Sequence, residues 1–323
     1  MTRVALLSNP RSTGNRALLP RVRSFCARHK DIFHYEVEHV DQIGAALRTI
    51  ARINPKVLVI NGGDGTVQAA LTELHQGAYF GDNPPPVAVL PNGKTNLIAL
   101  DLGADGDPIA ALERVLELAA SDLAPHVVSR ELISLSNGTA KPPVLGMFLG
   151  GAGLADTILF CRHKIYPLGL PNSFSHVLTA IALFLSMILG LRLAFLPPRP
   201  QPVTVSVRRH GQLQGRFAFL MVTTLERLLL GGHSPTPGAR KGALQLLIVE
   251  RRLASMARAF IAAIMGKLGR RELTGVHVER GDEILIEGDH SSVILDGELF
   301  EACSGHPILL KPTRPVPFLR LAA

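Results

Sequence analysis

The chain has 323 residues, 47% of them hydrophobic, and its 34 Lys and Arg against 26 Asp and Glu give a formal charge of +8. This length allows two folded domains, each with its own core. Aromatic residues make up only 5% and do not alternate with Arg, so nucleic acid is excluded as the expected partner. The positive charge instead suits a phosphorylated ligand or an anionic membrane surface.

We expect no signal peptide after Met1, because the first apolar run is too short. The three cysteines, Cys26, Cys161 and Cys303, are odd in number and lack the spacing of metal ligands. We therefore expect reduced thiols and a cytoplasmic protein.

The first 120 residues alternate between patterns typical of strands and of helices. Strands are predicted over 3–8, 34–40, 57–60 and 87–90, and helices over 18–28, 43–53 and 107–120, with a further helix after Thr66. Such β-α alternation predicts a parallel, right-handed α/β sheet. Ligands of these sheets bind beyond the carboxyl ends of the strands.

The stretch 57–66 reads V-L-V-I-N-G-G-D-G-T, a strand buried on both faces that ends in a glycine loop before a helix. Backbone N–H groups and a helix N-terminus at such a loop favour phosphate binding. Gly62, Gly63 and Gly65 permit positive φ angles and close approach of a ligand. Asp64 indicates a metal ion or proton transfer. A simple strand-to-helix turn with a capping Asp or Thr is the alternative.

After His126 short β-rich runs replace the β-α alternation. These runs cover 127–135, 144–148, 203–208, 217–223, 244–249, 276–279, 284–286 and 293–295. Their spacing predicts an antiparallel β-sandwich. We expect one domain over 1–126, a second over 127–304, and a segment 305–323 whose runs 308–311 and 316–319 return to complete the first.

Five short motifs, in the same order along nearly the whole chain, resemble those of one family of lipid kinases. G-G-D-G-T at 62–66 resembles the nucleotide-binding signature of the diacylglycerol, sphingosine and ceramide kinases. The segments 9–14, 91–99 and 151–156 resemble further loops of that family, and D-G-E at 296–298 matches a late signature. The resemblance implies a nucleotide-binding domain like those of NAD kinases and diacylglycerol kinases, followed by a β-sandwich lipid domain.

The resemblance also implies an activity and its residues. The activity is ATP-dependent phosphorylation of a primary hydroxyl on a ceramide, sphingoid or diacylglycerol lipid, with Mg²⁺ held at Asp64. Asp296 is named first as the general base, Asp64 second, with Glu298 beside Asp296 in D-G-E. Asp156 is implied to contact the lipid head group, unless it is a surface residue at a strand bend. The residues implied to bind nucleotide are Asn9, Thr13, Gly14, Gly62, Gly63, Asp64, Gly65, Thr66, Gly93, Lys94, Thr95, Asn96, Arg162, Lys164 and Glu298.

Several positions depart from the family pattern. Leu97 and Lys241 stand where acidic residues are usual, and Glu131 is the only carboxylate near a third acidic position at 129–130. The magnesium network of the bacterial diacylglycerol kinases is therefore absent or rebuilt. Leu97 also favours a sphingoid lipid such as ceramide, with diacylglycerol next. Lys94 is either a point charge on a phosphate or an exposed loop lysine, and Arg162 with Lys164 either reach the phosphates or form a solvated face.

Two other functions stay open at this stage. An NAD-kinase-like enzyme shares G-G-D-G-T, although the D-G-E motif and the apolar segment 177–191 weigh against it. A catalytically silent lipid- or nucleotide-binding protein would explain the missing acidic residues. The segment 177–191 is too short to span a bilayer and is predicted to be a core helix or an interfacial helix. The family resemblance implies that this helix flanks the lipid entrance. The protein is then peripheral at the inner face of the membrane, and a homodimer is an open alternative.

Overall fold

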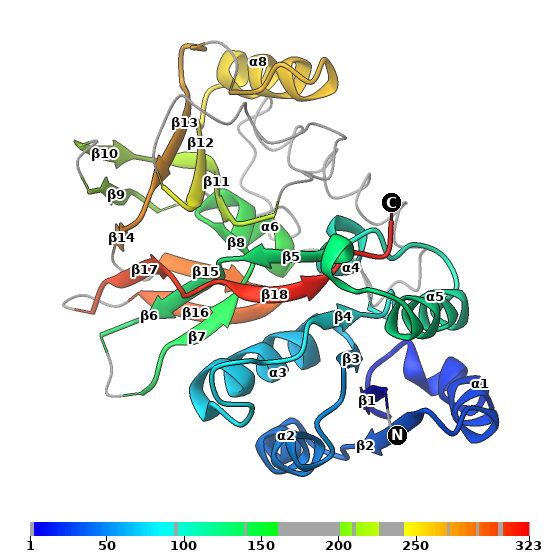
Figure 1. Ribbon diagram of the computed structural model, residues 1–323. Helices are drawn as coiled ribbons and strands as arrows, with labels where there is room; N and C mark the ends of the chain where they lie inside the picture. Colours follow the sequence, from blue (N-terminus) through cyan, green and yellow to red (C-terminus); the bar gives the residue numbers. More distant parts are fainter. Residues whose placement is uncertain are drawn as a thin grey trace. The chain divides into compact units, whose positions relative to one another are not determined.

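The computed structural model describes residues 3–93, 96–138, 141–160, 201–208, 211–225, 242–269, 272–288, 291–302 and 306–322 (Figure 1). The chain divides into two compact units. The first contains Met1–Leu132, Val144–Gly146 and Thr313–Ala323, and the second contains Ile133–Pro143 and Met147–Pro312. The functional domain limits at residues 126 and 305 stay a prediction.

The first unit is the predicted α/β domain. Its sheet has the order β2-β1-β3-β4-β18-β5 and is parallel except for β5, which runs antiparallel to β18. Helices α1 and α5 lie on one face and α2 and α3 on the other (Figure 1). The strands are β1 (Val4–Ser8), β2 (Ile32–Glu36), β3 (Val57–Asn61), β4 (Val87–Val89), β5 (Val127–Arg130), β7 (Val144–Gly146) and β18 (Val316–Leu319). The helices are α1 (Asn15–Arg28), α2 (Ile43–Arg52), α3 (Asp64–Gly77), α4 (Leu97–Asp101) and α5 (Pro108–Ala120), with short 3₁₀ turns at Val40–Gln42 and Ala124–His126.

These elements follow from local sequence. The central strands β1 and β3 are buried along their whole length, as their unbroken apolar runs predict. Helix α2 buries four residues at helical spacing, Ile43, Ala46, Leu47 and Ile50. Asp107 caps α5 by accepting a hydrogen bond from the Ile109 amide, next to a proline at the first helical position.

The strand predicted over 34–40 is displaced toward the N-terminus and ends at Glu36. The Gln42 side chain accepts hydrogen bonds from the amides of Glu38 and His39 at 2.9 and 3.2 Å. This local bonding folds the chain into a 3₁₀ turn ahead of α2 and ends the strand.

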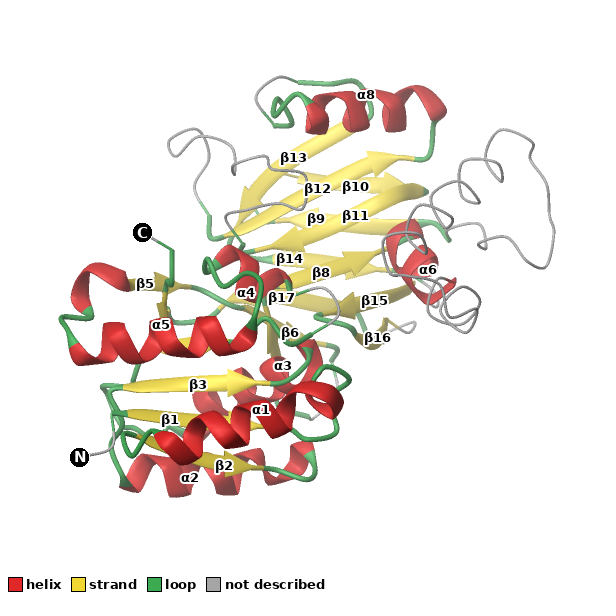
Figure 2. Cartoon of the chain, turned by 90° about the vertical axis from the view of Figure 1, so that its right-hand side faces the viewer, coloured by secondary structure: helices red, strands yellow, loops and turns green. Residues whose placement is uncertain are grey.

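The second unit is built from antiparallel sheets, which confirms the predicted class. One sheet contains β10-β9-β14-β17-β6, and the other has the order β13-β12-β11-β8-β15-β16 (Figure 2). Its strands are β6 (Ile133–Ser136), β8 (Phe148–Gly151), β9 (Val203–Val207), β10 (Gly211–Gly215), β11 (Phe217–Thr223), β12 (Leu244–Glu250), β13 (Val276–Gly281), β14 (Ile284–Glu287), β15 (Ser291–Leu295), β16 (Glu298–Ala302) and β17 (Ile308–Pro312). Two helices, α6 (Gly153–Phe160) and α8 (Leu253–Ile264), were not predicted.

The C-terminal segment does not return as a whole to the first unit, which corrects the sequence-based expectation. The run 308–311 lies in β17, which pairs with β14 and β6 inside the second unit. Only β18 joins the first sheet, where it pairs with both β4 and β5. Both segments are short apolar strands, so their destinations depend on which strand edges are open and not on their composition.

None of the helices in the described part of the chain is both long and apolar enough to cross a membrane. The apolar segment 177–191 lies outside the described residues.

Candidate functional site

Three loops of the first unit leave the sheet at the carboxyl ends of neighbouring strands. β1 ends at Ser8 and leads into Asn9, and β3 ends at Asn61 ahead of the glycine loop. The strands are parallel and in register, with Ser8 opposite Asn61. The loop after β4 carries Asn92 and Gly93. An asparagine therefore follows each of the three strands at one edge of the sheet.

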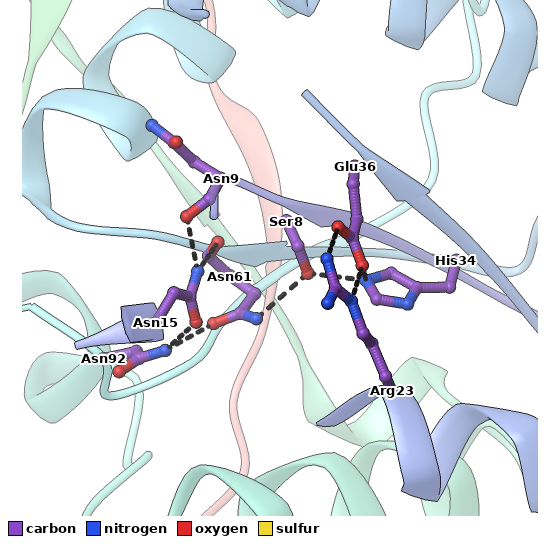
Figure 3. Close-up of polar contacts among 8 residues, drawn as sticks. All are labelled: Ser8, Asn9, Asn15, Arg23, His34, Glu36, Asn61 and Asn92. Atoms are coloured by element: carbon purple, nitrogen blue, oxygen red, sulfur yellow. Dashed lines mark hydrogen bonds and ion pairs between the residues drawn. The ribbon is translucent and has the colours of Figure 1, made fainter. Parts of the chain in front are cut away.

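Hydrogen bonds between side chains and backbone tie the first two loops together (Figure 3). The side-chain amide of Asn15 donates hydrogen bonds to the backbone carbonyl oxygens of Asn9 and Asn61 at 2.7 and 3.0 Å. The side-chain amide of Asn61 donates a hydrogen bond to Ser8 Oγ at 3.0 Å, and that of Asn9 donates one to Thr66 Oγ1 at 2.9 Å. All five side chains are buried. Buried amides held in this way fix the loops where they stand.

Asn92 joins the third loop to the other two. Its Nδ2 donates to Asn61 Oδ1 at 2.8 Å and also to Asn15 Oδ1 (Figure 3). The orientation of its amide follows from its neighbours, because both present a carbonyl oxygen while their own Nδ2 groups donate elsewhere. We call Asn9, Asn15, Asn61 and Asn92 the asparagine network.

Glycine is required at position 14 because a side chain there would have no room, and not because of its backbone angles. It lies at φ −67°, which any residue adopts. A Cβ at this position would lie 2.0 Å from Asn92 Oδ1 and 2.3 Å from the Asn92 carbonyl oxygen. The loop that carries Asn9, Ser12 and the exposed Thr13 can therefore close on Asn92 only with glycine at this position.

The glycine loop after β3 also lacks the positive φ angles that the sequence led us to expect. Neither Gly62, Gly63 nor Gly65 has positive φ. A Cβ on Gly62 would lie 2.6 Å from Thr66 Cβ, so this glycine permits close packing. Gly63 is open: the nearest atom to an added Cβ is Ser12 Cβ, 4.0 Å away. The backbone at Gly63 is therefore accessible just before the first turn of α3, where amide groups have no helical acceptor.

Asp64 opens α3 and lies next to the third loop. A Cβ on Gly93 would be 3.3 Å from Asp64 Oδ1 and 3.1 Å from Asn96 Oδ1. Asn96 takes a left-handed conformation at φ +52° and accepts a hydrogen bond from the Gly93 amide. Lys94 and Thr95, between them, lie outside the described residues.

The network continues sideways to β2 through residues that sequence reasoning missed. His34 Nε2 lies 2.8 Å from Ser8 Oγ, and burial lowers the pKa of His34 (Figure 3). Beside it Glu36 accepts two hydrogen bonds from Arg23, and these hold the pKa of Glu36 below its ordinary value. The asparagine at each strand end was the one sequence signal that could have predicted this network.

In the second unit, Asp296 is buried at the tip of the β15–β16 hairpin. It has φ +45° and Gly297 has φ +93°, the angles of a two-residue type I′ turn. Its carboxylate accepts hydrogen bonds from the amides of Met147 and Phe148 at 2.9 and 3.0 Å. The Asp296 amide donates to the Phe148 carbonyl at 2.9 Å. Asp296 therefore anchors the hairpin to the start of β8, and the neighbouring Glu298 is exposed.

Asp156 lies on α6 and is half-buried, and not at a strand bend as the alternative interpretation had it. Burial raises the pKa of its carboxyl group to about 6. The turn from β8 into α6 passes through Ala152 at φ +51°, a left-handed conformation that costs energy for a residue with a side chain. The basic residues Arg162 and Lys164 lie outside the described residues.

The described residues can hold a magnesium ion only with help from a ligand. They contain no group of three or more His, Cys, Asp or Glu side chains placed to bind a metal. Near the third acidic position Arg130 Nη2 lies 4.0 Å from the buried Asp101 Oδ2, so that carboxylate faces a cation of the protein. Mg²⁺ is commonly bound by one or two carboxylates together with substrate phosphates. Asp64, at the edge where phosphate would bind, fits this arrangement.

Comparison with known proteins agrees with the motifs. Residues 3–124 match the model of the diacylglycerol kinase catalytic domain. The chain therefore carries a kinase-type catalytic domain, as the resemblance implied. A comparison with curated proteins finds no match.

Solved structures of the same fold extend along both units. A crystal structure of a diacylglycerol kinase from Bacillus anthracis strain Sterne has a TM-score of 0.62 and 16% identity, and covers 98% of this chain and 96% of its own. A second structure from that strain, provisionally assigned as a diacylglycerol kinase, has a TM-score of 0.62 and 19% identity, with coverage of 97% and 94%. At this identity the likeness establishes the fold.

Proposed function

We propose that this protein is an ATP-dependent kinase that transfers the γ-phosphate to a primary hydroxyl of a membrane lipid of the diacylglycerol or ceramide type. The observation that carries the proposal is the edge of the first sheet, where the asparagine network locks three loops around the start of α3. A rigid set of backbone amides stabilises phosphate charge without reorganising during the reaction. This edge lies within the segment that matches the kinase catalytic domain.

Nucleotide binding is assigned to the open backbone at Gly63 and to the first turn of α3. Because an added Cβ at Gly63 meets no atom closer than 4.0 Å, a phosphate oxygen has room to approach the main chain there. Asp64 would hold Mg²⁺ together with the triphosphate, and the ion supplies neutralisation of the phosphate charge. The side-chain amide of Asn9 donates a hydrogen bond to Thr66 Oγ1, which holds the glycine loop after β3 in place.

The lipid hydroxyl must lose its proton as it attacks, and a carboxylate is the usual acceptor. We assign Asp296 as this base because its carboxylate is held rigidly by the backbone amides of Met147 and Phe148. Asp156 is assigned to the lipid head group. A neutral carboxyl group near pH 6 would donate a hydrogen bond to a lipid hydroxyl, and an ionised one would accept it.

A second candidate function is nucleotide binding without phosphoryl transfer. It is favoured by Leu97 at an acidic position of the family and by the lack of an acidic metal cluster among the described residues. Phosphoryl transfer to any lipid would exclude it.

The loop assignment is tested by Gly63→Val. Valine is compatible with the extended backbone at φ −78°, ψ 176° and has open space, so the variant should fold with a loss of about 1 kcal/mol. Its side chain would occupy the position of the phosphate, and calorimetry should detect no ATP binding. Unchanged ATP affinity in a folded variant would show that phosphate binds elsewhere.

The activity is tested with labelled ATP and diacylglycerol, ceramide and a sphingoid base, each dispersed in detergent micelles. We expect one lipid to be phosphorylated and the reaction to stop when EDTA removes Mg²⁺. The solved relatives of this fold make diacylglycerol the first substrate to test. ATP binding without a phosphorylated product from any lipid would favour the silent binding protein.

A further inference from the structure

Helix α8 of the second unit is apolar on two opposite faces. Its inner face carries Ser255, Ala259 and Ala262, which are spaced by about one helical turn, and Met256 next to Ser255. Met256 and Ala259 pack on a buried cluster formed by Met221, Leu247, Val249 and Val276 of strands β11, β12 and β13. This inner face accounts for the attachment of the helix to the sheet (Figure 2).

The outer face is apolar as well but faces solvent. It consists of Leu253, Phe260, Ile261, Ile264 and Met265, which we call the α8 ridge. Phe260 is 61% exposed and Ile264 is 62% exposed. Elsewhere in the described residues only Val40, Leu100 and Leu299 are large hydrophobic residues of comparable exposure. Concentration of apolar surface on one short helix marks an interaction site, because isolated exposed hydrophobic residues are normal but clusters are not.

Basic residues lie on α8 and close to it in the sequence. Residues 251–271 contain six Lys and Arg and no Asp or Glu. Arg252, Arg258 and Lys267 are exposed. Arg258 donates a hydrogen bond to the Thr274 carbonyl at 3.0 Å, and the Nε of Arg252 lies 3.4 Å from the Glu250 carboxylate. The ridge is therefore a strip of large aliphatic and aromatic side chains with basic side chains beside it.

We propose that the α8 ridge docks this protein on the surface of an anionic membrane. Apolar side chains would enter the boundary between headgroups and acyl chains while the basic side chains meet lipid phosphates, as in interfacial amphipathic helices. A second copy of the chain is a poorer occupant, because a symmetric contact would bring together two copies of segment 251–271, which contains six Lys and Arg and no Asp or Glu. The biological purpose rests on the proposed function, since a lipid kinase must reach a substrate that lies in a bilayer.

Vesicle binding of the full chain tests the proposal. The wild-type protein should co-sediment with vesicles that contain phosphatidylglycerol, more weakly with pure phosphatidylcholine, and less as salt is raised. Phe260→Gln with Ile264→Gln removes two inserted side chains and should weaken binding by about tenfold or more. Val40→Gln is the matched control, since Val40 is also half exposed but lies in the first unit. It should bind like the wild type.

The charge contribution has its own variant. Arg252→Gln with Lys267→Gln should reduce the preference for anionic vesicles and flatten the salt dependence, with unchanged thermal unfolding. The proposal is overturned if the wild type does not bind at low salt, or if the Phe260 and Ile264 double variant binds normally. It is also overturned if the wild type is a dimer that this variant dissociates, because the ridge is then an interface between copies.

Activity assays with lipid in micelles and in vesicles distinguish a loss of membrane docking from a loss of catalysis. With lipid in detergent micelles the ridge variant should phosphorylate at the wild-type rate, whereas with anionic vesicles it should be slower. If no form of the protein phosphorylates lipid in micelles, the proposed function fails while vesicle binding still decides the docking proposal. Equal rates of wild type and ridge variant on vesicles would count against the ridge.

Discussion

At the scale of single residues, the candidate site depends on side chains that stabilise loops. Asn92 donates to two buried amide oxygens, on Asn15 and on Asn61. A buried acceptor that loses its donor costs about 1–3 kcal/mol, which exceeds the net gain from making such a bond. The network therefore resists substitution even though none of its bonds is strong by itself.

Asn92→Ala should lower the free energy of unfolding by about 2–4 kcal/mol, because it leaves two buried oxygens without their donor. Urea denaturation measures this change. Asn83→Ala replaces an exposed loop asparagine of the same unit and should change stability by less than about 0.5 kcal/mol. Equal stability of the two variants would contradict the structural role of the network.

The ionised carboxylate of Asp156 is predicted to lower the free energy of unfolding at neutral pH. Its pKa is raised by burial to about 6 from a reference of 3.8, so the folded state prefers the protonated form. The stability that this preference provides is complete below about pH 3.8 and is lost as pH rises through about 6. Asp156→Asn, which stays neutral, should therefore be more stable than the wild type above pH 6, by about 1 kcal/mol after solvent screening.

Thermal unfolding at pH 4 and pH 7.5 measures this effect. The two proteins should unfold at similar temperatures at pH 4 and separate at pH 7.5. If Asp156 also contacts the lipid, the stabilised variant should lose activity. A variant that is less stable at pH 7.5 would show that the carboxylate has a compensating partner.

At the scale of elements, the β15–β16 hairpin combines a local turn with a distant anchor. The D-G pair suits a type I′ turn by itself. The carboxylate of Asp296 then accepts one amide hydrogen bond on each oxygen, from Met147 and Phe148. Asparagine offers only one acceptor oxygen and would turn its NH₂ group toward the other N–H.

Asp296→Asn should therefore lower the free energy of unfolding by about 1–3 kcal/mol as well as reduce activity. Loss of a general base costs about 10²–10⁴-fold in rate. Activity measured well below the unfolding temperature separates the two effects. A base would leave the rate low there, whereas a purely structural anchor would allow it to recover. Glu298→Gln, on the exposed side of the same turn, is the control for stability.

At the scale of the whole molecule, the chain passes between the two units more than once, and its last strand, β18, belongs to the first unit. β18 lies between β4 and β5, and its residues Phe318 and Leu319 are fully buried. A fully buried side chain of this kind contributes about 1.5–3 kcal/mol. The last strand therefore supplies a large share of the stability expected of one domain.

Ending the chain after Pro312 should unfold the first unit selectively. The deletion removes the partner of both β4 and β5 and the buried side chains of β18. We expect loss of ATP binding and rapid proteolysis within residues 1–132, while fragments of the second unit persist. Arg314→Ala, in the exposed connection before β18, should leave proteolysis unchanged. Normal ATP binding by the shortened chain would contradict the role of β18.

The sequence by itself determined the local structure of the first unit and the chemistry of its loops. Unbroken apolar runs predicted β1 and β3, and helical spacing predicted α2. The G-G-D-G-T loop lies after β3, as the sequence predicts, and its phosphate binding stays a prediction. These signals are readable because periodicity and turn chemistry act between residues close in the chain.

Only the tertiary structure decided which distant residues meet. Asn15, Asn61 and Asn92 come together because β1 and β3 pair in one register and Gly14 allows the loops to close. Among the glycines that the sequence assigned to positive φ angles, Gly62 serves close packing against Thr66, whereas Gly63 leaves open space. β17 and β18 look alike in sequence, yet pair in different units. Which strand a segment pairs with depends on the sheet edges that are open in the whole fold, and local sequence patterns do not specify it.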